Sequence, residues 1–456
     1  MDMRKFSFGL FRALRNLYEE AGLEAYQRKG LDWILRANLC GNFWCIICGS
    51  GTAAMVGLAN LFGAGDLEFG LLAAIPQVAA VLQIPFSMLI NKTHKRKFYI
   101  MTWGLASRAI WLLMGFLPLA FHGATARLGM TVLLMLMALS YSGNSLINVC
   151  WFPWFSDIAP LRIRGRWLSI RDAINSIGGL LFGLLVAYLL DELPAASKFT
   201  IIFLIGGAFG VMDMVCFSQV RDEWKSPAPQ ISFRKTLRSV LSNKPFMRFS
   251  LMWTTWCFTS NMAGSYLTPY AMNSMGLNYM QITVFGSVAA SVATVLAVSR
   301  WGRMVDRFGS RNVMLLCCMA ASLTQLFYLF SVPGSIWPTF LYNVIGAAFW
   351  SGSNLAANSM QLYASPDAER PSYIAVFACV TALAGTALGT LCGSWILTFC
   401  ESRGLFAGRF DRYMALIVLA TALRFGSTLL LVPRMPNERS ASLRDMFRFV
   451  SHPGKK

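Results

Sequence analysis

Two long apolar runs are separated by the stretch Gly302-Arg303-Met304-Val305-Asp306-Arg307-Phe308-Gly309-Ser310-Arg311. Its pattern, G-x3-D-R-x-G-x-R, combines two glycines with one acid and several bases. Glycine permits the backbone conformations of tight turns, and Asp can pair with a nearby Arg or cap a helix N-terminus across an interface. The pattern predicts a basic, sharply turning connection between two membrane-spanning helices. An ordinary basic loop is the alternative interpretation.

The apolar runs on either side of this stretch belong to a series of twelve. The chain of 456 residues is 56% hydrophobic and 13% charged, whereas soluble domains carry about 25% charged residues. Each run is long enough to cross about 30 Å of hydrocarbon at about 1.5 Å per residue. We therefore predict an all-α integral membrane protein with twelve transmembrane helices, at 34–60, 69–90, 98–121, 128–152, 168–190, 199–220, 247–270, 279–299, 312–332, 337–361, 373–399 and 413–433.

The basic residues are distributed unevenly between the two sides of these spans. The net charge is +19, but the basic residues lie between apolar runs and not on one face of a soluble module, so we do not expect nucleic-acid binding. If the spans alternate in direction, 33 of the 40 Lys and Arg residues fall on one side and 5 on the other. The positive-inside rule then places both termini in the cytoplasm of a multi-pass protein of the cell membrane.

A polar segment divides the twelve spans into six and six. It covers 221–246 and contains Pro227, Pro229 and Pro245. Six spans on each side of a linker indicate an internal duplication. We predict an amphipathic N-terminal segment on the cytoplasmic membrane surface (1–33), a six-helix bundle (34–220), a cytoplasmic linker (221–246), a second six-helix bundle (247–433) and a basic cytoplasmic tail (434–456).

The stretch 302–311, with the twelve spans and the central linker, resembles the major facilitator superfamily over nearly the whole chain. The resemblance implies two pseudo-symmetric bundles that rock around a site at the membrane midplane. It also implies a conformational gate at the quoted stretch, formed by Gly302, Asp306, Arg307, Gly309 and Arg311. The corresponding loop of the first half, 91–97, departs from the pattern because it has no Asp and no glycine.

Two further inner loops carry acids and bases that suit a cytoplasmic gate. Asp157, Arg164 and Arg166 follow span four, and Arg370 follows span ten. We expect these groups to pair across the halves when the inner side closes. The alternative interpretation is charge that only sets the topology.

Three charges lie inside predicted spans. Arg108 and Asp213 lie at similar depths in spans three and six, and because an unpaired charge in a membrane is costly we predict that they form a pair. Arg424 lies in span twelve, where span nine offers Thr324 and Gln325 as neutral neighbours. The alternative is that the arginines extend to the interface. Proton coupling through Asp213 is a further hypothesis.

Spans one, four, seven and ten, which by resemblance line the cavity, are rich in amides and aromatic rings. Spacings of three and four place such residues on one helical face in spans four and ten. Hydrogen bonding within a half and an aromatic belt at the interface are the alternatives. The predicted solute-binding residues are Asn42, Trp44, Asn144, Asn148, Trp151, Trp256, Asn261, Tyr266, Trp350, Asn354, Asn358 and Gln361.

These four spans carry no carboxylate or Lys at mid-membrane, which favours a neutral polar solute such as a sugar or nucleoside. A multidrug exporter of the same fold and a non-transporting receptor are the alternatives. No catalytic motif, P-loop or metal-ligand spacing is present, so we expect neither an enzyme nor a cofactor or metal. The expected partners are the solute, the lipid bilayer and a coupling ion (H+ or Na+) that the sequence does not specify. We expect a monomer.

Overall fold

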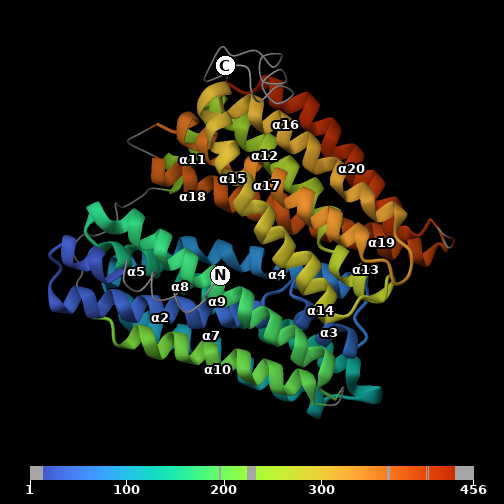
Figure 1. Cartoon of the computed structure of the whole chain (residues 1–456), viewed down its shortest axis with the longest axis horizontal. Coiled ribbons are helices and arrows are strands. Elements are labelled where there is room, and N and C mark those ends of the chain that lie inside the picture. The colour runs from blue at the N-terminus through green and yellow to red at the C-terminus, as the bar shows by residue number, and fades with distance from the viewer. Residues whose placement is uncertain are drawn as a thin grey trace. The chain divides into compact units, whose positions relative to one another are not determined.

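The computed structural model describes residues 14–194, 197–222, 233–366, 370–406, 408 and 410–436. Their contacts form two compact units, one from residues up to 64 together with 79–230, and the other from 65–78 together with 231–456. The domain limits predicted from sequence did not separate 65–78, the beginning of the second span, from the first bundle. Figure 1 shows both units as bundles of long helices.

The first unit contains six transmembrane columns, the second of which is shared with the other unit. In Figure 1, α2, α7, α8 and α10 run alongside one another. A short π-helical segment joins α6 to α7 and keeps that column continuous. The helices are α2 (Ala25–Cys48), α3 (Ala53–Leu61), α4 (Asp66–Ala79), α5 (Gln83–Thr93), α6 (Arg96–Tyr99), α7 (Leu105–Ala120), α8 (Ala126–Ile158), α9 (Leu161–Glu192) and α10 (Lys198–Ser218).

The second unit repeats the arrangement with six columns after the linker. Part of the linker is itself helical, and the bundle begins at Lys244, slightly before the predicted boundary. The helices are α11 (Phe233–Ser242), α12 (Lys244–Gly264), α13 (Leu267–Asn273), α14 (Tyr279–Gln281), α15 (Ala289–Phe308), α16 (Ser310–Thr324), α17 (Trp337–Ala364), α18 (Arg370–Val380), α19 (Leu388–Ser402) and α20 (Arg412–Leu431).

Within the described residues, ten helical segments are long and apolar enough to cross a membrane. The predicted seventh and tenth spans, which correspond to α12 with α13 and to α17, are not among the ten. These are two of the four spans that sequence analysis found rich in amides and aromatic rings. Their polarity lowers their mean hydropathy, although they occupy the places of membrane columns in the twelve-helix fold.

The first predicted span is interrupted. It was expected as one run over 34–60, but α2 ends at Cys48 and α3 starts at Ala53. A Cβ on Gly49 would lie 2.7 Å from the carbonyl oxygen of Cys45, which fits the absence of a side chain at this break. The Thr52 hydroxyl accepts a hydrogen bond from the Met55 amide at 3.2 Å and caps the new helix.

The described part of the predicted N-terminal segment, from residue 14 onward, packs on the first bundle. Leu14 and Leu17 are buried in the same apolar cluster as Trp167. Trp167 Nε1 donates to the Tyr18 hydroxyl at 3.2 Å, and that hydroxyl donates to Asp32 at 3.0 Å. Burial raises the pKa of Tyr18 well above its usual value. The apolar side chains of Leu14 and Leu17 are therefore buried against side chains of the first bundle.

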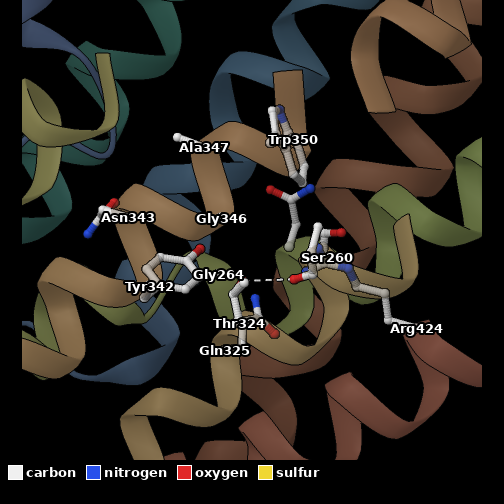
Figure 2. A pocket seen from close by; sticks show the side chains of 12 residues that line it. Ser260, Gly264, Thr324, Gln325, Tyr342, Asn343, Gly346, Ala347, Trp350 and Arg424 are labelled. Atoms are coloured by element: carbon white, nitrogen blue, oxygen red, sulfur yellow. Dashed lines mark hydrogen bonds between the residues drawn. The ribbon is translucent and has the colours of Figure 1, made fainter. Parts of the chain in front are cut away.

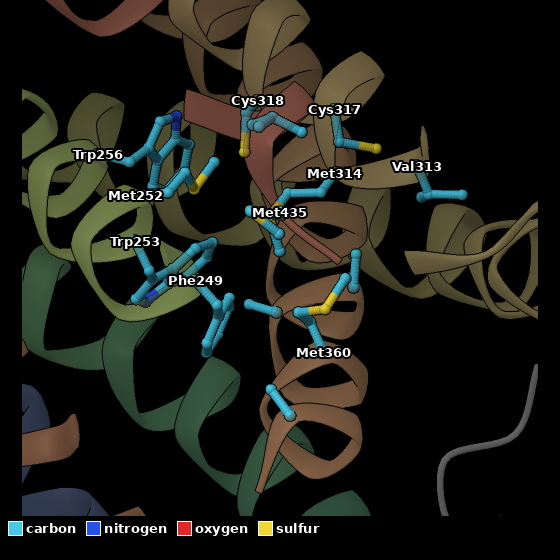
Figure 3. Packing of buried hydrophobic residues seen from close by; sticks show 14 of the residues in the cluster. Phe249, Met252, Trp253, Trp256, Val313, Met314, Cys317, Cys318, Met360 and Met435 are labelled. Carbon is cyan, nitrogen blue, oxygen red and sulfur yellow. The ribbon is translucent and has the colours of Figure 1, made fainter. Parts of the chain in front are cut away.

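Close helix packing in the second unit depends on small residues. A Cβ on Gly389 would lie 2.3 Å from the Phe258 carbonyl oxygen, and one on Gly393 would lie 2.0 Å from that of Met262. These glycines are four residues apart on α19, so they let α12 approach along one face. Figure 3 shows a cluster of this unit, in which Trp253, Trp256 and Met252 of α12 pack near Cys318 of α16.

Candidate functional site

A cavity of about 360 Å³ lies inside the second unit, between α12, α16, α17 and α20. Figure 2 shows side chains from these helices gathered around it. The size is in the range of small-molecule pockets, which are typically about 300–1,000 Å³. The residues that line it are Ser260, Asn261, Gly264, Ala321, Thr324, Gln325, Tyr342, Asn343, Gly346, Ala347, Trp350 and Arg424.

Arg424 is the positively charged residue in the cavity lining. It projects from α20 and extends toward Ser260 in Figure 2, and only 3% of it is exposed. Its guanidinium lies 4.6 Å from the ring centre of Trp256 and 5.8 Å from that of Trp350. These two rings are themselves 4.5 Å apart. Aromatic faces attract a cation, but they leave the buried Nε–H of the guanidinium without an acceptor.

Several buried polar atoms around the cavity have no hydrogen-bond partner. They are Arg424 Nε, Ser260 Oγ, Gln325 Oε1 and Trp256 Nε1. Most buried polar atoms of folded proteins are paired, and each one left unpaired costs about 1–3 kcal/mol. Such a group of atoms next to a cavity is typical of a site that a ligand or ordered water completes.

This cavity contains some of the residues predicted from sequence to bind solute. Asn261 and Trp350, both predicted to bind solute, line it. Trp256 lies beside it, against Trp350 and Arg424. Tyr266 is buried elsewhere, and its hydroxyl donates to the Thr390 carbonyl oxygen at 2.7 Å. Its side chain is therefore engaged in packing α13 against α19.

Arg424, Thr324 and Gln325, predicted to be neighbours, line the same cavity. This placement removes the reason for expecting a neutral solute. That expectation depended on the absence of charge from spans one, four, seven and ten. Here the charge comes from span twelve, because α20 packs against α12 and α16.

The amide stripes on α8 and α17 lie toward the surface of their own bundles. Asn148 and Asn358 are exposed, and the others are partly exposed. The side-chain amides make no hydrogen bond within the described part of the chain, which disfavours interhelical bonding as their role. Trp151, on the α8 stripe, lies under Arg171 at 5.1 Å. The unbonded amides are those of Asn144, Asn148, Asn354, Asn358 and Gln361.

The two predicted site residues on α2, Asn42 and Trp44, make their contacts within the first bundle. Asn42 Nδ2 donates to the Asn175 carbonyl oxygen at 2.9 Å. Trp44 is buried, and the Arg108 guanidinium lies 3.6 Å from its ring centre. Arg108 also pairs with Asp213 at 3.2 Å, which confirms the predicted pair between spans three and six.

The stretch 302–311 makes the predicted turn at only one of its glycines. Gly309 has φ +83°, a conformation that favours glycine, and it separates α15 from α16. Gly302 instead lies inside α15, where a Cβ would be 3.9 Å from Leu355 of α17. Asp306 and Arg307 are exposed on this unit. Arg311 donates to the Met435 carbonyl oxygen at 3.5 Å.

The loop of the first half contains a charged centre that sequence analysis missed. Arg96 is 2% exposed and donates to Asp157 at 2.6 Å and to Asp222 at 2.7 Å. Asp157 was expected to pair across the halves, but its partner lies in its own bundle. Arg96 therefore connects the ends of α8 and α10. This role was not predicted because the loop lacks the Asp and glycines of the pattern found at 302–311.

The other predicted gate arginines also have partners nearby. Arg164 donates to the Ser156 carbonyl oxygen at 2.5 Å and to that of Ala159 at 2.8 Å, which caps the end of α8. Arg166 pairs with Glu20 at 2.8 Å in an exposed position. Arg370, at the start of α18, donates to the Leu362 carbonyl oxygen at 3.5 Å.

An ion-pair group in the second unit was also not predicted. Asp66, at the start of α4, is almost fully buried and lies 3.2 Å from Arg412. The Tyr413 hydroxyl donates to Asp66 at 2.6 Å, and Ser394 donates to its carbonyl oxygen at 3.0 Å. These contacts attach residues 65–78 to this unit. The signal in the sequence was two acids, Asp66 and Glu68, at the start of an apolar run.

The described residues contain no group of three or more His, Cys, Asp or Glu that could hold a metal ion. All eleven cysteines are free thiols.

Comparisons with known proteins agree with this architecture. A family model described as Major Facilitator Superfamily matches residues 39–390 and 288–454. No curated protein sequence matches the chain significantly. A bacterial homologue of the human lysosomal transporter Spinster, in an inward-facing and unoccupied conformation, is 16% identical with a TM-score of 0.64, over 91% of this chain and 100% of that chain.

Two further solved structures share the fold. A mutant of the nucleoside transporter NupG is 12% identical with a TM-score of 0.67, over 89% of this chain and 100% of that chain. A D-xylose-proton symporter is 13% identical with a TM-score of 0.64, over 91% of this chain and 99% of that chain. Identities this low show a common fold. With the family model spanning most of the sequence, the chain belongs to the major facilitator superfamily.

Proposed function

We propose that the protein is a secondary transporter that moves a small polar solute across a cell membrane by alternating access. The observation that carries the proposal is the polar cavity between α12, α16, α17 and α20. A cavity lined by amides, hydroxyls and an indole inside a bundle of apolar helices is costly to maintain for packing alone.

The lining supports a solute of monosaccharide or nucleoside size. Asn261, Gln325 and Asn343 can exchange hydrogen bonds with hydroxyl groups, and Trp350 offers a face on which a ring can stack. The superfamily members with a similar fold include proteins named for a nucleoside and for D-xylose, and both are small polar solutes with rings.

The unbonded amides on α8 and α17 support a wider contact surface for the solute. A transporter exposes different faces of its bundles as it changes conformation, so polar residues on bundle surfaces are expected along the solute path. We propose that the stretch 302–311 and the loop that contains Arg370 act as cytoplasmic gates. We propose also that both termini are cytoplasmic and that the protein acts as a monomer.

The test is counterflow in proteoliposomes that contain the purified protein, with labelled sugars (D-xylose and D-glucuronate) and labelled nucleosides (uridine and uridine monophosphate) as probes. Uptake above that of protein-free vesicles is expected for at least one member of one of these two classes and is expected to fall at least tenfold in Gln325→Leu. The matched control is Gln219→Leu, at an exposed position near the end of α10. Counterflow that persists unchanged in Gln325→Leu would contradict the assignment of this cavity. Binding of a solute without any counterflow would favour a receptor over a transporter.

A further inference from the structure

The buried arginines of the two bundles, Arg108 and Arg424, differ in their ion pairing. In the first, Arg108 stacks on Trp44 at 3.6 Å and pairs with Asp213 at 3.2 Å. In the second, Arg424 stacks on Trp256 and Trp350, but no carboxylate of the described residues forms an ion pair with it. The aromatic support is present in both bundles, whereas the counter-ion is present only in the first.

The carboxylates in the described part of the second unit are at helix ends. Asp66 and Glu68 lie in the first turn of α4, Asp306 is two residues before the end of α15, Glu401 is one residue before the end of α19 and Asp411 caps α20. Asp66 and Glu401 also lie within ion-pair distance of Arg412. Arg424 is near the middle of α20, more than two helical turns from the Asp411 cap.

An arginine that is 3% exposed inside a membrane bundle needs compensation for its lost hydration. Neutral dipoles and aromatic faces supply part of it, yet the Nε hydrogen still has no acceptor. The cavity next to it has room for a small molecule. An anionic oxygen placed there would accept charge-assisted hydrogen bonds from the guanidinium, and these are stronger than neutral ones.

We infer that the solute carries an acidic group, a carboxylate or a phosphate monoester on a polar ring, and that Arg424 binds that group. This inference rests on the proposed function, because it names the chemical class of the transported solute. Trp350 then stacks on the ring, and the Ser260 hydroxyl and the amides of Asn261 and Gln325 bind its hydroxyl groups. The counter-ion that Asp213 supplies permanently to Arg108 is supplied to Arg424 by the cargo.

The first experiment compares acids with their neutral counterparts by thermal unfolding of the purified wild-type protein. The probes are D-glucuronate against D-glucose, and uridine monophosphate against uridine, at equal ionic strength. A ligand at about 100 times its dissociation constant stabilises by about 2.7 kcal/mol, so binding is readily seen. We expect at least one acid to raise the unfolding temperature while its neutral counterpart does not.

Variants connect the effect to Arg424. Arg424→Gln is expected to weaken the binding of the acid by about tenfold or more, the loss typical of a charged hydrogen bond. Arg424→Lys keeps the charge but not the planar fork, so a smaller loss is expected, and this variant serves if Arg424→Gln does not fold. Arg403→Gln removes an exposed arginine between α19 and α20 and is expected to leave the shift unchanged.

Three results would overturn the inference. They are equal shifts from acid and neutral probes, no shift from any acid, and a full shift from chloride or inorganic phosphate alone. Counterflow distinguishes this failure from failure of the proposed function. Transport of a neutral solute that Arg424→Gln leaves unaltered would refute the acidic cargo and retain the transporter. Acid binding that depends on Arg424, without counterflow of the acid, would retain the anion site and refute transport.

Discussion

Replacing Asp213 by Asn removes the carboxylate that pairs with Arg108 and keeps the size of the side chain. Arg108 is 5% exposed, and its Nε and Nη1 atoms already have no partner. Removing one member of a buried pair costs about 3–5 kcal/mol because the other charge stays buried. Asn retains one acceptor oxygen, so the expected loss is about 3 kcal/mol, at the lower end of this range. For a unit of this size that loss lowers Tm by roughly 6–12 °C.

The double variant Arg108→Gln with Asp213→Asn separates the pair from its surroundings. It leaves two neutral groups that can hydrogen-bond, so it is expected to recover most of the stability lost in the single variant. The control is Glu19→Gln. It breaks a pair with Arg15 in which the side chains are 81% and 55% exposed, and exposed pairs contribute less than about 1 kcal/mol.

The assay is the thermal unfolding of each purified variant in one detergent, followed by intrinsic tryptophan fluorescence. The reasoning fails if Asp213→Asn melts within about 1 °C of the wild type. It also fails if the double variant loses the sum of the two single losses, because the charges would then act independently.

Three other predictions concern contacts in both units. Arg96→Gln leaves two carboxylates without their shared cation and is expected to cost about 2–3 kcal/mol, seen as a lower Tm; an unchanged Tm would contradict a structural role. Gly393→Ala places a methyl group against the Met262 carbonyl oxygen and is expected to abolish the monodisperse peak in size-exclusion chromatography, whereas Gly426→Ala, with no atom within 4 Å, is expected to keep it. Tyr18→Phe removes one hydrogen-bond acceptor and one donor, at a cost of about 1–3 kcal/mol, and is expected to speed proteolysis of the N-terminal segment; equal cleavage rates would contradict the packing described.

The placement of helices was largely predictable because the bilayer imposes it. Apolar runs of about 20 residues must form helices in hydrocarbon, where every backbone group needs an internal partner. A sharp turn in the stretch 302–311 was predictable for a local reason, because glycine permits the backbone conformations of tight turns. The ends were less predictable. The first span breaks at Gly49, and the segment with Leu14 and Leu17 packs on protein because complementary side chains are available there.

The choice of partners was decided mainly by the tertiary structure. Arg108 and Asp213 were predictable as a pair because they are the first half's only two charges deep within spans. The ion pair of Asp157 with Arg96 was not predicted, because the two residues are 61 positions apart in the chain and only the tertiary fold brings them together.

Most of the membrane-spanning segments, and the polar residues within them, could be predicted from the chain because length and hydropathy are local properties. Which of those residues share a cavity depends on how the helices pack. Arg424, Gln325 and Asn261 come from three helices more than 60 residues apart in the chain. Their meeting depends on the rotation of each helix about its axis and on close packing at glycines such as Gly389, and neither can be obtained from hydropathy alone.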